Sequence, residues 1–218
     1  FTVPLVVRMP YGGGVRALEH HSESKEVYWA HTAGIKVVIP SSPANAGPLL
    51  TAAIQDPDPV VFMEPKRSYR SFKETVDKEK NAFSIGKAHV KETGKDITII
   101  SWGAMMRDTI KAVEAVKSKT GFQPEVIDLL TISPMDVDTI VTSVKKTGRC
   151  VVVQEAQQSF GPASEIIAVI NDQALMYLEA PVKRVTMYDV VMPLFAREQL
   201  YMPKVSDIDQ AITETLHF

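Results

Sequence analysis

The residues best suited to chemistry are gathered near the N-terminus, between Tyr11 and Glu26. Three consecutive glycines, Gly12 to Gly14, predict a tight turn in which the backbone can approach another group closely. Two histidines, His20 and His21, follow on what we expect to be a loop leading into a helix. Beside the positive end of a helix an imidazole stays neutral, which suits it to hydrogen-bond a carbonyl or a carboxylate. The residues alone leave this role and a structural one equally open.

Other interpretations of the same segment have weaker support. The glycines lack the Gly-Lys-Ser/Thr ending of a phosphate loop, and no strand-turn-helix unit follows directly, so a bare turn is the simpler interpretation. The two histidines have no third ligand at a spacing typical of zinc sites. We expect Ser22 or Ser24 to cap the helix that follows.

Three further groups of residues could carry chemistry. The turn Asp56-Pro57-Asp58-Pro59 offers two carboxylates and exposed carbonyls to a hard cation, although a rigid proline-rich turn explains it without a ligand. The basic run from Lys66 to Arg70 could bind phosphate, but simple solvation is the preferred interpretation. The single cysteine, Cys150, lies in an apolar run and is expected to be a buried structural thiol.

These candidates lie among strand-like and helix-like segments that alternate as in a parallel α/β fold. We expect strands at residues 4–8, 35–40, 60–64, 96–102, 124–130, 149–155 and 182–187, and helices at 24–31, 46–54, 106–117, 136–146, 162–174 and 206–216. The charge-rich stretch from Lys66 to Lys95 lacks apolar periodicity, which indicates an interdomain linker; a solvated helix on a single domain is the alternative. The expected domains are therefore residues 1–78 and 95–218, joined by a linker at 79–94.

The composition excludes some partners. The chain has 218 residues, of which 45% are hydrophobic, and its 26 acidic and 24 basic residues give a net charge of -2. Charges of both signs are spread along the chain, so we expect neither nucleic acid nor a membrane as a partner. No apolar run approaches the roughly 20 residues of a membrane-spanning helix, and no signal peptide is recognisable. We expect a cytoplasmic protein, or one of the mitochondrial matrix if eukaryotic. Because the chain opens directly on a strand-like run, we also expect residues upstream of it.

The order of these motifs resembles the β subunits of thiamine-diphosphate-dependent 2-oxo acid dehydrogenases. Residues 8–14, 19–26, 34–40, 56–66 and 69–70 are similar to the pyrimidine-binding domain of that family, and residues 101–105, 125–129, 146–149, 154–156 and 178–181 to its C-terminal domain. The branched-chain type fits best, with pyruvate and acetoin enzymes close behind. The fold implied is α/β: part of a transketolase-like pyrimidine-binding domain, followed by a transketolase C-terminal domain with a mostly parallel sheet.

The resemblance implies an enzyme subunit that works with partners. A dehydrogenase α subunit, a second β subunit and a lipoyl acyltransferase core would complete the complex. Thiamine diphosphate with Mg²⁺ would be bound mainly by the α subunit and by upstream residues, so no cofactor-binding residue is expected in this chain. The subunit would take part in oxidative decarboxylation of a 2-oxo acid and in acyl transfer to lipoamide, and would be inactive alone.

The resemblance also implies roles for particular residues. His21 matches the active-site histidine of the family, and His20 is a less certain neighbour. Ala53, through its carbonyl, and Asp56 and Asp58 match positions that bind a structural potassium ion in relatives. Glu179 and the C-terminal carboxylate of Phe218 match positions that dock the acyltransferase core.

The sequence departs from the family pattern at two places, residues 157–161 and 187–193, where glycine-containing stretches are replaced. Two alternatives to an enzyme subunit stay open at this point. One is a non-catalytic module for assembly and docking in the same complex. The other is a nucleotide-binding α/β domain that uses Gly12 to Gly14 as its phosphate loop.

Overall fold

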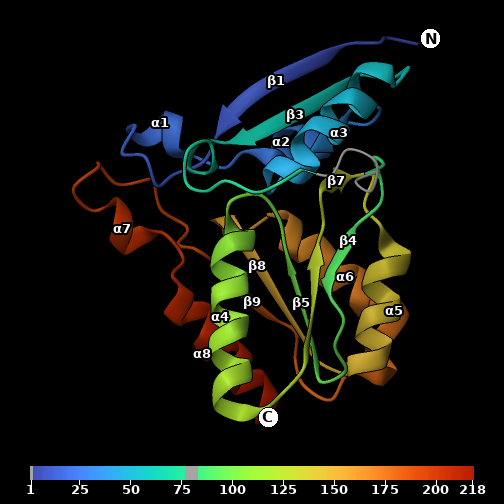
Figure 1. Cartoon of the computed structure of the whole chain (residues 1–218), viewed down its shortest axis with the longest axis vertical. Coiled ribbons are helices and arrows are strands. Elements are labelled where there is room, and N and C mark those ends of the chain that lie inside the picture. Colours follow the sequence, from blue (N-terminus) through green and yellow to red (C-terminus); the bar gives the residue numbers. More distant parts are fainter. Residues whose placement is uncertain (1, 77–82) are drawn as a thin grey trace.

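The computed structural model describes residues 2–76 and 83–218, which form two α/β layers stacked end to end (Figure 1). The first sheet has the order β1-β3-β2-β7. Its strands β1 (Val6–Tyr11), β3 (Val60–Pro65) and β2 (Lys36–Val38) are parallel, with Val6 and Lys36 both paired to Val60. All six residues of β3 are buried, as the continuous apolar run predicts for a strand covered on both faces.

Four helical segments accompany the first sheet. They are α1 (Glu19–Ser22), α2 (Glu26–Ala30), α3 (Pro43–Gln55) and the 3₁₀ turn η1 (Lys66–Ser68). The start of α3 is set by Pro43 at its first position and by Asn45, whose side chain accepts hydrogen bonds from the backbone N–H groups of Ser41 and Ser42 at 3.0 and 3.1 Å.

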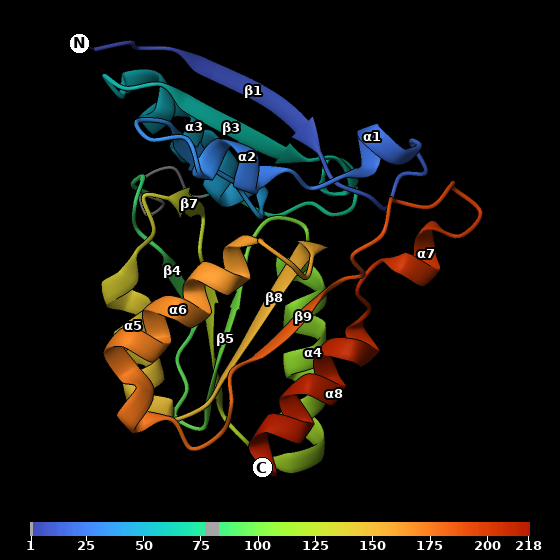
Figure 2. The ribbon, with the colours of Figure 1, turned by 180° about the vertical axis from the view of Figure 1, so that it is seen from behind.

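The second sheet has the order β4-β6-β5-β8-β9. Its strands are β4 (His89–Glu92), β6 (Pro124–Asp128), β5 (Ile97–Ser101), β8 (Cys150–Gln157) and β9 (Lys183–Met187). Only the pairing of β4 with β6 is antiparallel among the pairings of this sheet. Helices α4 (Met105–Thr120) and α8 (Val205–Leu216) cover one face, and α5 (Val137–Thr147) and α6 (Pro162–Ala174) cover the other (Figures 1 and 2).

Alternation along β5 explains why both faces are covered. Ile97 and Ile99 pack with the apolar residues of α4 and α8, whereas Ile100 belongs to the cluster that includes α5 and α6. On the α5 side, the Thr98 hydroxyl bonds the hydroxyls of Ser143 and Thr147 at 2.7 Å each, so this buried polar residue is satisfied. Glycines in the left-handed conformation, Gly121 and Gly148, end α4 and α5.

The two layers are joined by a strand that the second half contributes to the first sheet. After β6 the chain runs directly into β7 (Thr131–Ser133), which pairs antiparallel with β2. The Ile39 N–H donates to the Leu130 carbonyl at 2.8 Å, and the Leu129 N–H to the Ser101 carbonyl at 2.9 Å. One hydrophobic cluster, which includes Tyr11, Val37 and Met63 as well as Ile100, Trp102 and Ile127, continues through both layers.

The expected α/β fold class is confirmed, and each predicted strand and helix is present to within a few residues. The pattern missed α1, β4, β7, the two 3₁₀ turns η1 and η2 (Leu175–Tyr177), and α7 (Glu198–Tyr201). Within the expected linker at 79–94, residues 89–92 form the edge strand β4, which sequence did not predict because a polar edge strand lacks the apolar run that marks central strands. Residues 79–82 lie outside the described part of the chain, and the domain boundaries stay a prediction.

Candidate functional site

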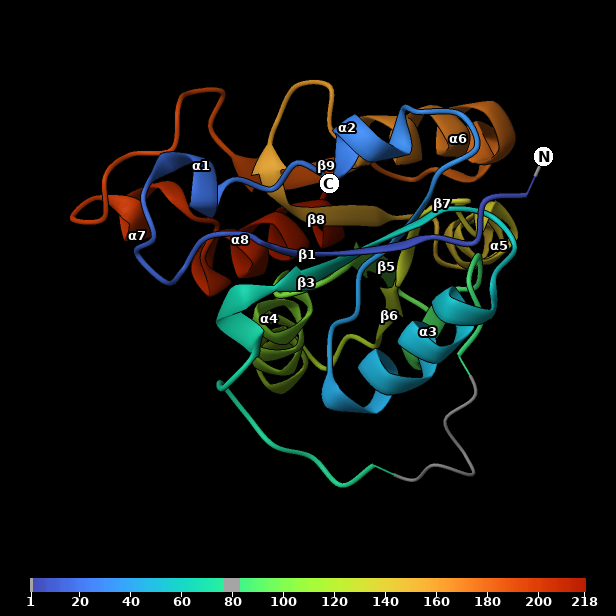
Figure 3. The same cartoon turned by 90° about the horizontal axis from the view of Figure 1, so that it is seen from above.

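The glycine turn and the two histidines belong to one loop, residues 12–23, which lies at the junction of the two layers (Figure 1) and runs from β1 through α1 towards α2 (Figure 3). The loop is closed at its neck, where the Gly12 N–H donates to the Glu23 carbonyl at 3.2 Å. His20 and His21 lie within the short helix α1 and are both exposed. They lie in the connection ahead of the next helix, as expected, but within it they form a helical turn of their own that the sequence did not predict.

The predicted helix cap is also wrong. Helix α2 begins at Glu26, with Lys25 at the N-cap position and no capping hydrogen bond from that side chain. Ser22 and Ser24 are buried. The Ser24 hydroxyl instead donates to Glu155 Oε1 at 3.0 Å. Ser24 therefore binds a side chain of the second layer and does not cap α2.

The backbone N–H groups of the glycine turn bind two carboxylates of the second layer. The Gly13 N–H donates to Glu155 Oε1 at 2.8 Å, and the Gly14 N–H donates to Glu198 Oε1 at 2.6 Å. The Arg16 N–H donates to the other oxygen, Glu198 Oε2, at 2.8 Å. This is the anion-binding geometry of successive N–H groups, but the anions belong to the protein itself. The alternative of a phosphate loop is therefore contradicted.

Two basic residues that were expected to be solvated, Lys66 and Arg67, instead contact the loop or the carboxylate that binds it. Arg67 lies with its Nε 3.5 Å from Glu155 Oε2 and donates from Nη1 to Asp108 Oδ2 at 2.7 Å. The Lys66 ammonium donates to the backbone carbonyl of His21, and burial lowers the pKa of Lys66. Arg67 is therefore paired with the buried Glu155 and the partly buried Asp108, and Lys66 with a loop carbonyl, whereas Arg70 of the same run is exposed as expected.

Buried carboxyl groups continue beneath the loop. Burial raises the pKa of Glu155, against the opposing effects of Arg67 and the Gly13 N–H. Burial also raises the pKa of Glu26 to about 7, although Trp102 Nε1 donates to its Oε1 at 3.2 Å. Its other oxygen, Oε2, is buried without a hydrogen-bond partner in the described residues. Tyr11 is buried beside these groups, and burial raises its pKa as well.

The predicted potassium ligands lie together, but a lysine lies between them. Lys36 Nζ is 2.7 and 2.8 Å from the two carboxylate oxygens of Asp56 and 3.1 Å from Asp58 Oδ2. The Ala53 carbonyl accepts a hydrogen bond from the Asp56 N–H at 3.4 Å. Although burial acts to raise it, the bonds from Lys36 hold the pKa of Asp56 below its ordinary value. The ammonium supplies the positive charge that was expected from a metal ion.

Within residues 2–76 and 83–218, no group of three or more His, Cys, Asp or Glu side chains could hold a metal ion. Cys150 is buried, and burial raises the pKa of its thiol, which agrees with the structural role expected of it. No helix in the described ranges is long and apolar enough to cross a membrane.

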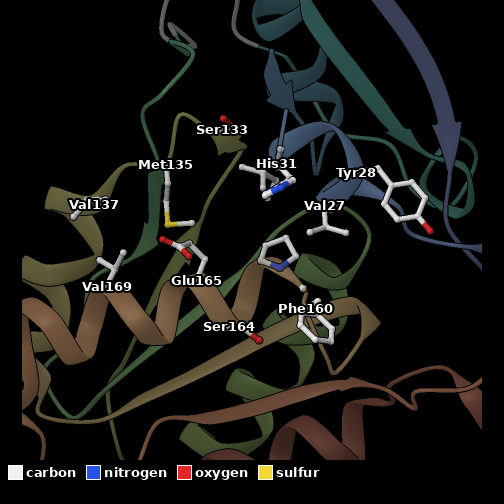
Figure 4. Close-up of a pocket in the computed structure, with 14 residues that line it drawn as sticks. Val27, Tyr28, His31, Ser133, Met135, Val137, Phe160, Ser164, Glu165 and Val169 are labelled. Atoms are coloured by element: carbon white, nitrogen blue, oxygen red, sulfur yellow. The ribbon is translucent and has the colours of Figure 1, made fainter. Parts of the chain in front are cut away.

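A cavity of about 930 Å³, which neither His20 nor His21 lines, lies between α2, the segment before α5 and the N-terminal end of α6 (Figure 4). Its lining is mainly apolar, including Val27, Met135 and Val169, with His31 and Glu165 as polar members. His31 directly follows the last residue of α2. No residue of the loop at 12–23 lines this cavity, so it is separate from the candidate site at His21.

Sequence reasoning found His21 but missed the residues that hold its loop. Glu155 had one signal, because an acidic residue at the end of a buried strand requires partners. Glu198 had none, since it lies in a short helix that no apolar periodicity predicts.

Two family models match this chain. The transketolase pyrimidine binding domain matches residues 1–71, and the transketolase C-terminal domain matches residues 86–208. A solved structure described as a split gene transketolase, inactive beta4 tetramer, has a TM-score of 0.82 and 22% identity, covering 99% of this chain and 67% of that one. At that identity the likeness shows the fold. Fold and loop together thus define a two-domain protein of the transketolase type.

Closer relatives narrow the class. The pyruvate dehydrogenase E1 component subunit beta of Acholeplasma laidlawii is 50% identical over 208 residues, which are 95% of this chain and 63% of that protein. The subunit of the same name from Bacillus subtilis (strain 168) is 46% identical over 218 residues, which are 100% of this chain and 67% of that protein. The chain belongs to the family of the β subunits of thiamine-diphosphate-dependent 2-oxo acid dehydrogenases. It spans about two thirds of the length of these relatives.

Proposed function

We propose that this chain forms part of the β subunit of the dehydrogenase component of a 2-oxo acid dehydrogenase complex. The observation that carries the proposal is the state of His21, whose side chain is exposed while its backbone is held by Lys66 within a closed loop. A fixed but uncovered imidazole is suited to meet a ligand that another polypeptide segment brings to it.

His21 would act on the substrate rather than on the cofactor. Its imidazole would hydrogen-bond the carboxylate of the 2-oxo acid and move a proton during acyl transfer to lipoamide, because the two ring nitrogens of histidine can donate and accept hydrogen bonds. Bound thiamine diphosphate would supply the electron sink for decarboxylation.

We assign the cofactor and its Mg²⁺ mainly to the α subunit and to upstream residues. The glycine turn supports this assignment, because its N–H groups at Gly13 and Gly14 are engaged by Glu155 and Glu198 and are not free for a diphosphate. A second β subunit and the acyltransferase core would complete the assembly. A cytoplasmic location, or the mitochondrial matrix in a eukaryote, stays a prediction.

Glu179 and Phe218 remain the proposed docking residues for the acyltransferase core. Glu179 is held by Arg149 Nη1 at 2.5 Å from its Oε2, with 60% of its side chain exposed, and Phe218 is 77% exposed. The C-terminus lies at the end of the second layer that faces away from the first (Figures 1 and 2). Docking there would leave the His21 loop accessible.

Pyruvate is the substrate that the relatives favour, since the two described above are named for it. The branched-chain type, which the motifs favoured, gains no support from them. A non-catalytic docking module is the alternative, and the same experiment separates all three.

The experiment is to co-express the complete β subunit with its α subunit and to assay pyruvate, branched-chain 2-oxo acids and acetoin with lipoamide as acceptor. We expect turnover with pyruvate, and we expect His21→Ala to lower lipoamide-dependent turnover by about 100-fold or more while thiamine diphosphate affinity changes little. His20→Ala is the matched control, since it removes the neighbouring exposed imidazole of the same helix. Unchanged turnover in His21→Ala, or equal losses in both variants, would reject the role of His21. Absence of turnover with every substrate would favour the docking module.

A further inference from the structure

The direction of α1 depends on backbone conformations that side chains disfavour. Arg16 and Leu18, between the glycine turn and α1, have φ angles of 58° and 69°. A residue with a Cβ atom is strained in this left-handed region, and such strain persists only where surrounding contacts impose it. The loop therefore needs an external group that holds it in this shape.

Glu198 is the group that contacts this turn directly. Its two carboxylate oxygens accept hydrogen bonds from the backbone N–H groups of Gly14 and Arg16, at 2.6 and 2.8 Å. The residue is 1% exposed, and a carboxylate is costly to bury unless hydrogen bonds replace its water. Both carboxylate oxygens of Glu198 therefore bind the part of the loop that contains the strained Arg16.

The helix that carries Glu198 is itself anchored. Tyr201 donates its hydroxyl to the carbonyls of Tyr188 and Val190 at 2.9 Å each. Its ring packs in a buried cluster with Met187, Met192 and Met202. A Cβ atom on Gly13 would lie 2.5 Å from Met202 Sδ, so the glycine turn lies directly against this cluster. Figure 3 shows α7 near the loop that carries α1. Glu198 is therefore a fixed point from which the loop can be held.

We propose that Glu198 is a positioning residue for His21. It holds the turn at Gly14 and Arg16 and so sets the direction in which α1 presents the His21 imidazole. Lys66 also contacts the same helix, through the backbone carbonyl of His21. The inference rests on the proposed function of His21 and adds to it a residue 177 positions downstream, from the other layer of the fold.

A double-mutant cycle in the complete α and β assembly tests this role. Glu198→Gln keeps the size of the side chain but leaves a single oxygen acceptor, so one of the two loop bonds is lost. We expect it to lower lipoamide-dependent turnover roughly ten- to 100-fold, with a smaller effect on decarboxylation measured with an artificial electron acceptor. Glu114→Gln, an exposed residue of α4, is the control for the charge change and is expected to behave as the wild type.

The decisive comparison is Glu198→Gln combined with His21→Ala. If Glu198 acts through His21, the double variant is no slower than His21→Ala alone; independent roles would multiply the two losses and overturn the proposal. If His21→Ala alone leaves turnover unchanged, the proposed function of His21 has failed and this inference falls with it. A normal His21 effect with multiplied losses sinks only the positioning role.

If Glu198→Gln fails to fold in the otherwise wild-type protein, the cycle is repeated in a protein that also carries Arg16→Gly. Arg16→Gly removes the strain of the left-handed conformation, so Glu198→Gln is expected to assemble in that background, and the same cycle can be measured there. If Glu198→Gln still fails to assemble, Glu198 is a folding residue and the proposal is overturned.

Discussion

Lys36 places one fixed ammonium between two carboxylates where a bound cation was expected. Because the folded pKa of Asp56 lies below its ordinary value of 3.8, this contact contributes stability above about pH 4, and the contribution is lost as the pH falls through the folded pKa. We expect Lys36→Met to lower the free energy of unfolding by roughly 1 kcal/mol at pH 7 and by much less at pH 3, as measured by urea denaturation.

A thermal melt in two salts decides the potassium prediction. A melting temperature of the wild-type protein that is higher in KCl than in NaCl would show that potassium joins the lysine at this turn. Equal melting temperatures would remove the predicted site. Arg197→Met, an exposed cation elsewhere, serves as the control for nonspecific salt effects.

At the residue scale, sequence could identify groups but not the contacts that use them. His21 was recognisable because its neighbours along the chain form a motif. Glu155 and Glu198 contact the loop across 142 and 184 positions, and no local pattern encodes such distant pairs. The lysine between Asp56 and Asp58 was missed for the same reason, since it enters from another strand.

At the element scale, the connection between β4 and β5 requires a glycine, Gly94, because of a close backbone contact and not because of a left-handed φ angle. A Cβ atom on Gly94 would lie 2.2 Å from both the Gln123 carbonyl oxygen and the Pro124 carbonyl carbon, which are backbone atoms of the adjacent segment. We expect Gly94→Ala to destabilise the protein by about 1–3 kcal/mol, because the backbone must move to accept the methyl group. Urea denaturation measures the loss.

Gly47→Ala is the matched control. Gly47 lies inside α3, and no atom outside its chain neighbours and its own helix backbone lies within 4 Å of its added Cβ. Alanine there is expected to change the free energy of unfolding by less than about 1 kcal/mol, because its higher helix propensity is offset by crowding of the Cβ against Pro48. Changes of equal sign and size in the two variants would contradict the steric argument.

The elements that sequence could predict share one property. Central strands such as β3 and β8 are continuous apolar runs, and α4, α5 and α8 have apolar residues at helical spacing. The missed elements, β4, β7, α1 and α7, have three or four residues each, and they take their stability from tertiary contacts. These elements depend on contacts with residues far away in the sequence, so a short stretch of sequence does not predict them.

At the scale of the whole molecule, buried carboxyl groups link the two layers. Glu26 of α2 accepts from Trp102 after β5, and Asp128 at the end of β6 accepts from Ser41 beside α3. Burial raises the pKa of each to about 7. Each therefore binds a proton in the folded state that it loses more readily when unfolded.

The sign of the pH dependence follows. A carboxyl group with a raised folded pKa gives full stability below its ordinary pKa of 4.5, and this stability falls as the pH rises through about 7. We expect Glu26→Gln, which is neutral at every pH and can still accept from Trp102, to raise the melting temperature at pH 8 and to change it little at pH 5. Thermal melts at both pH values measure this. A variant that is less stable than the wild type at pH 8 would show that the charged form of Glu26 is the one the interface needs.

The strand β7 makes the order of synthesis matter. The ribosome completes β1, β2 and β3 well before residue 133 is made, so the first sheet emerges with the open edge of β2 still waiting for its neighbour. An open strand edge invites pairing with other chains. The nascent protein must therefore keep that edge shielded until the second half has begun to form, and a gene cut at the charge-rich stretch between the halves would release a first half that can never close its own sheet.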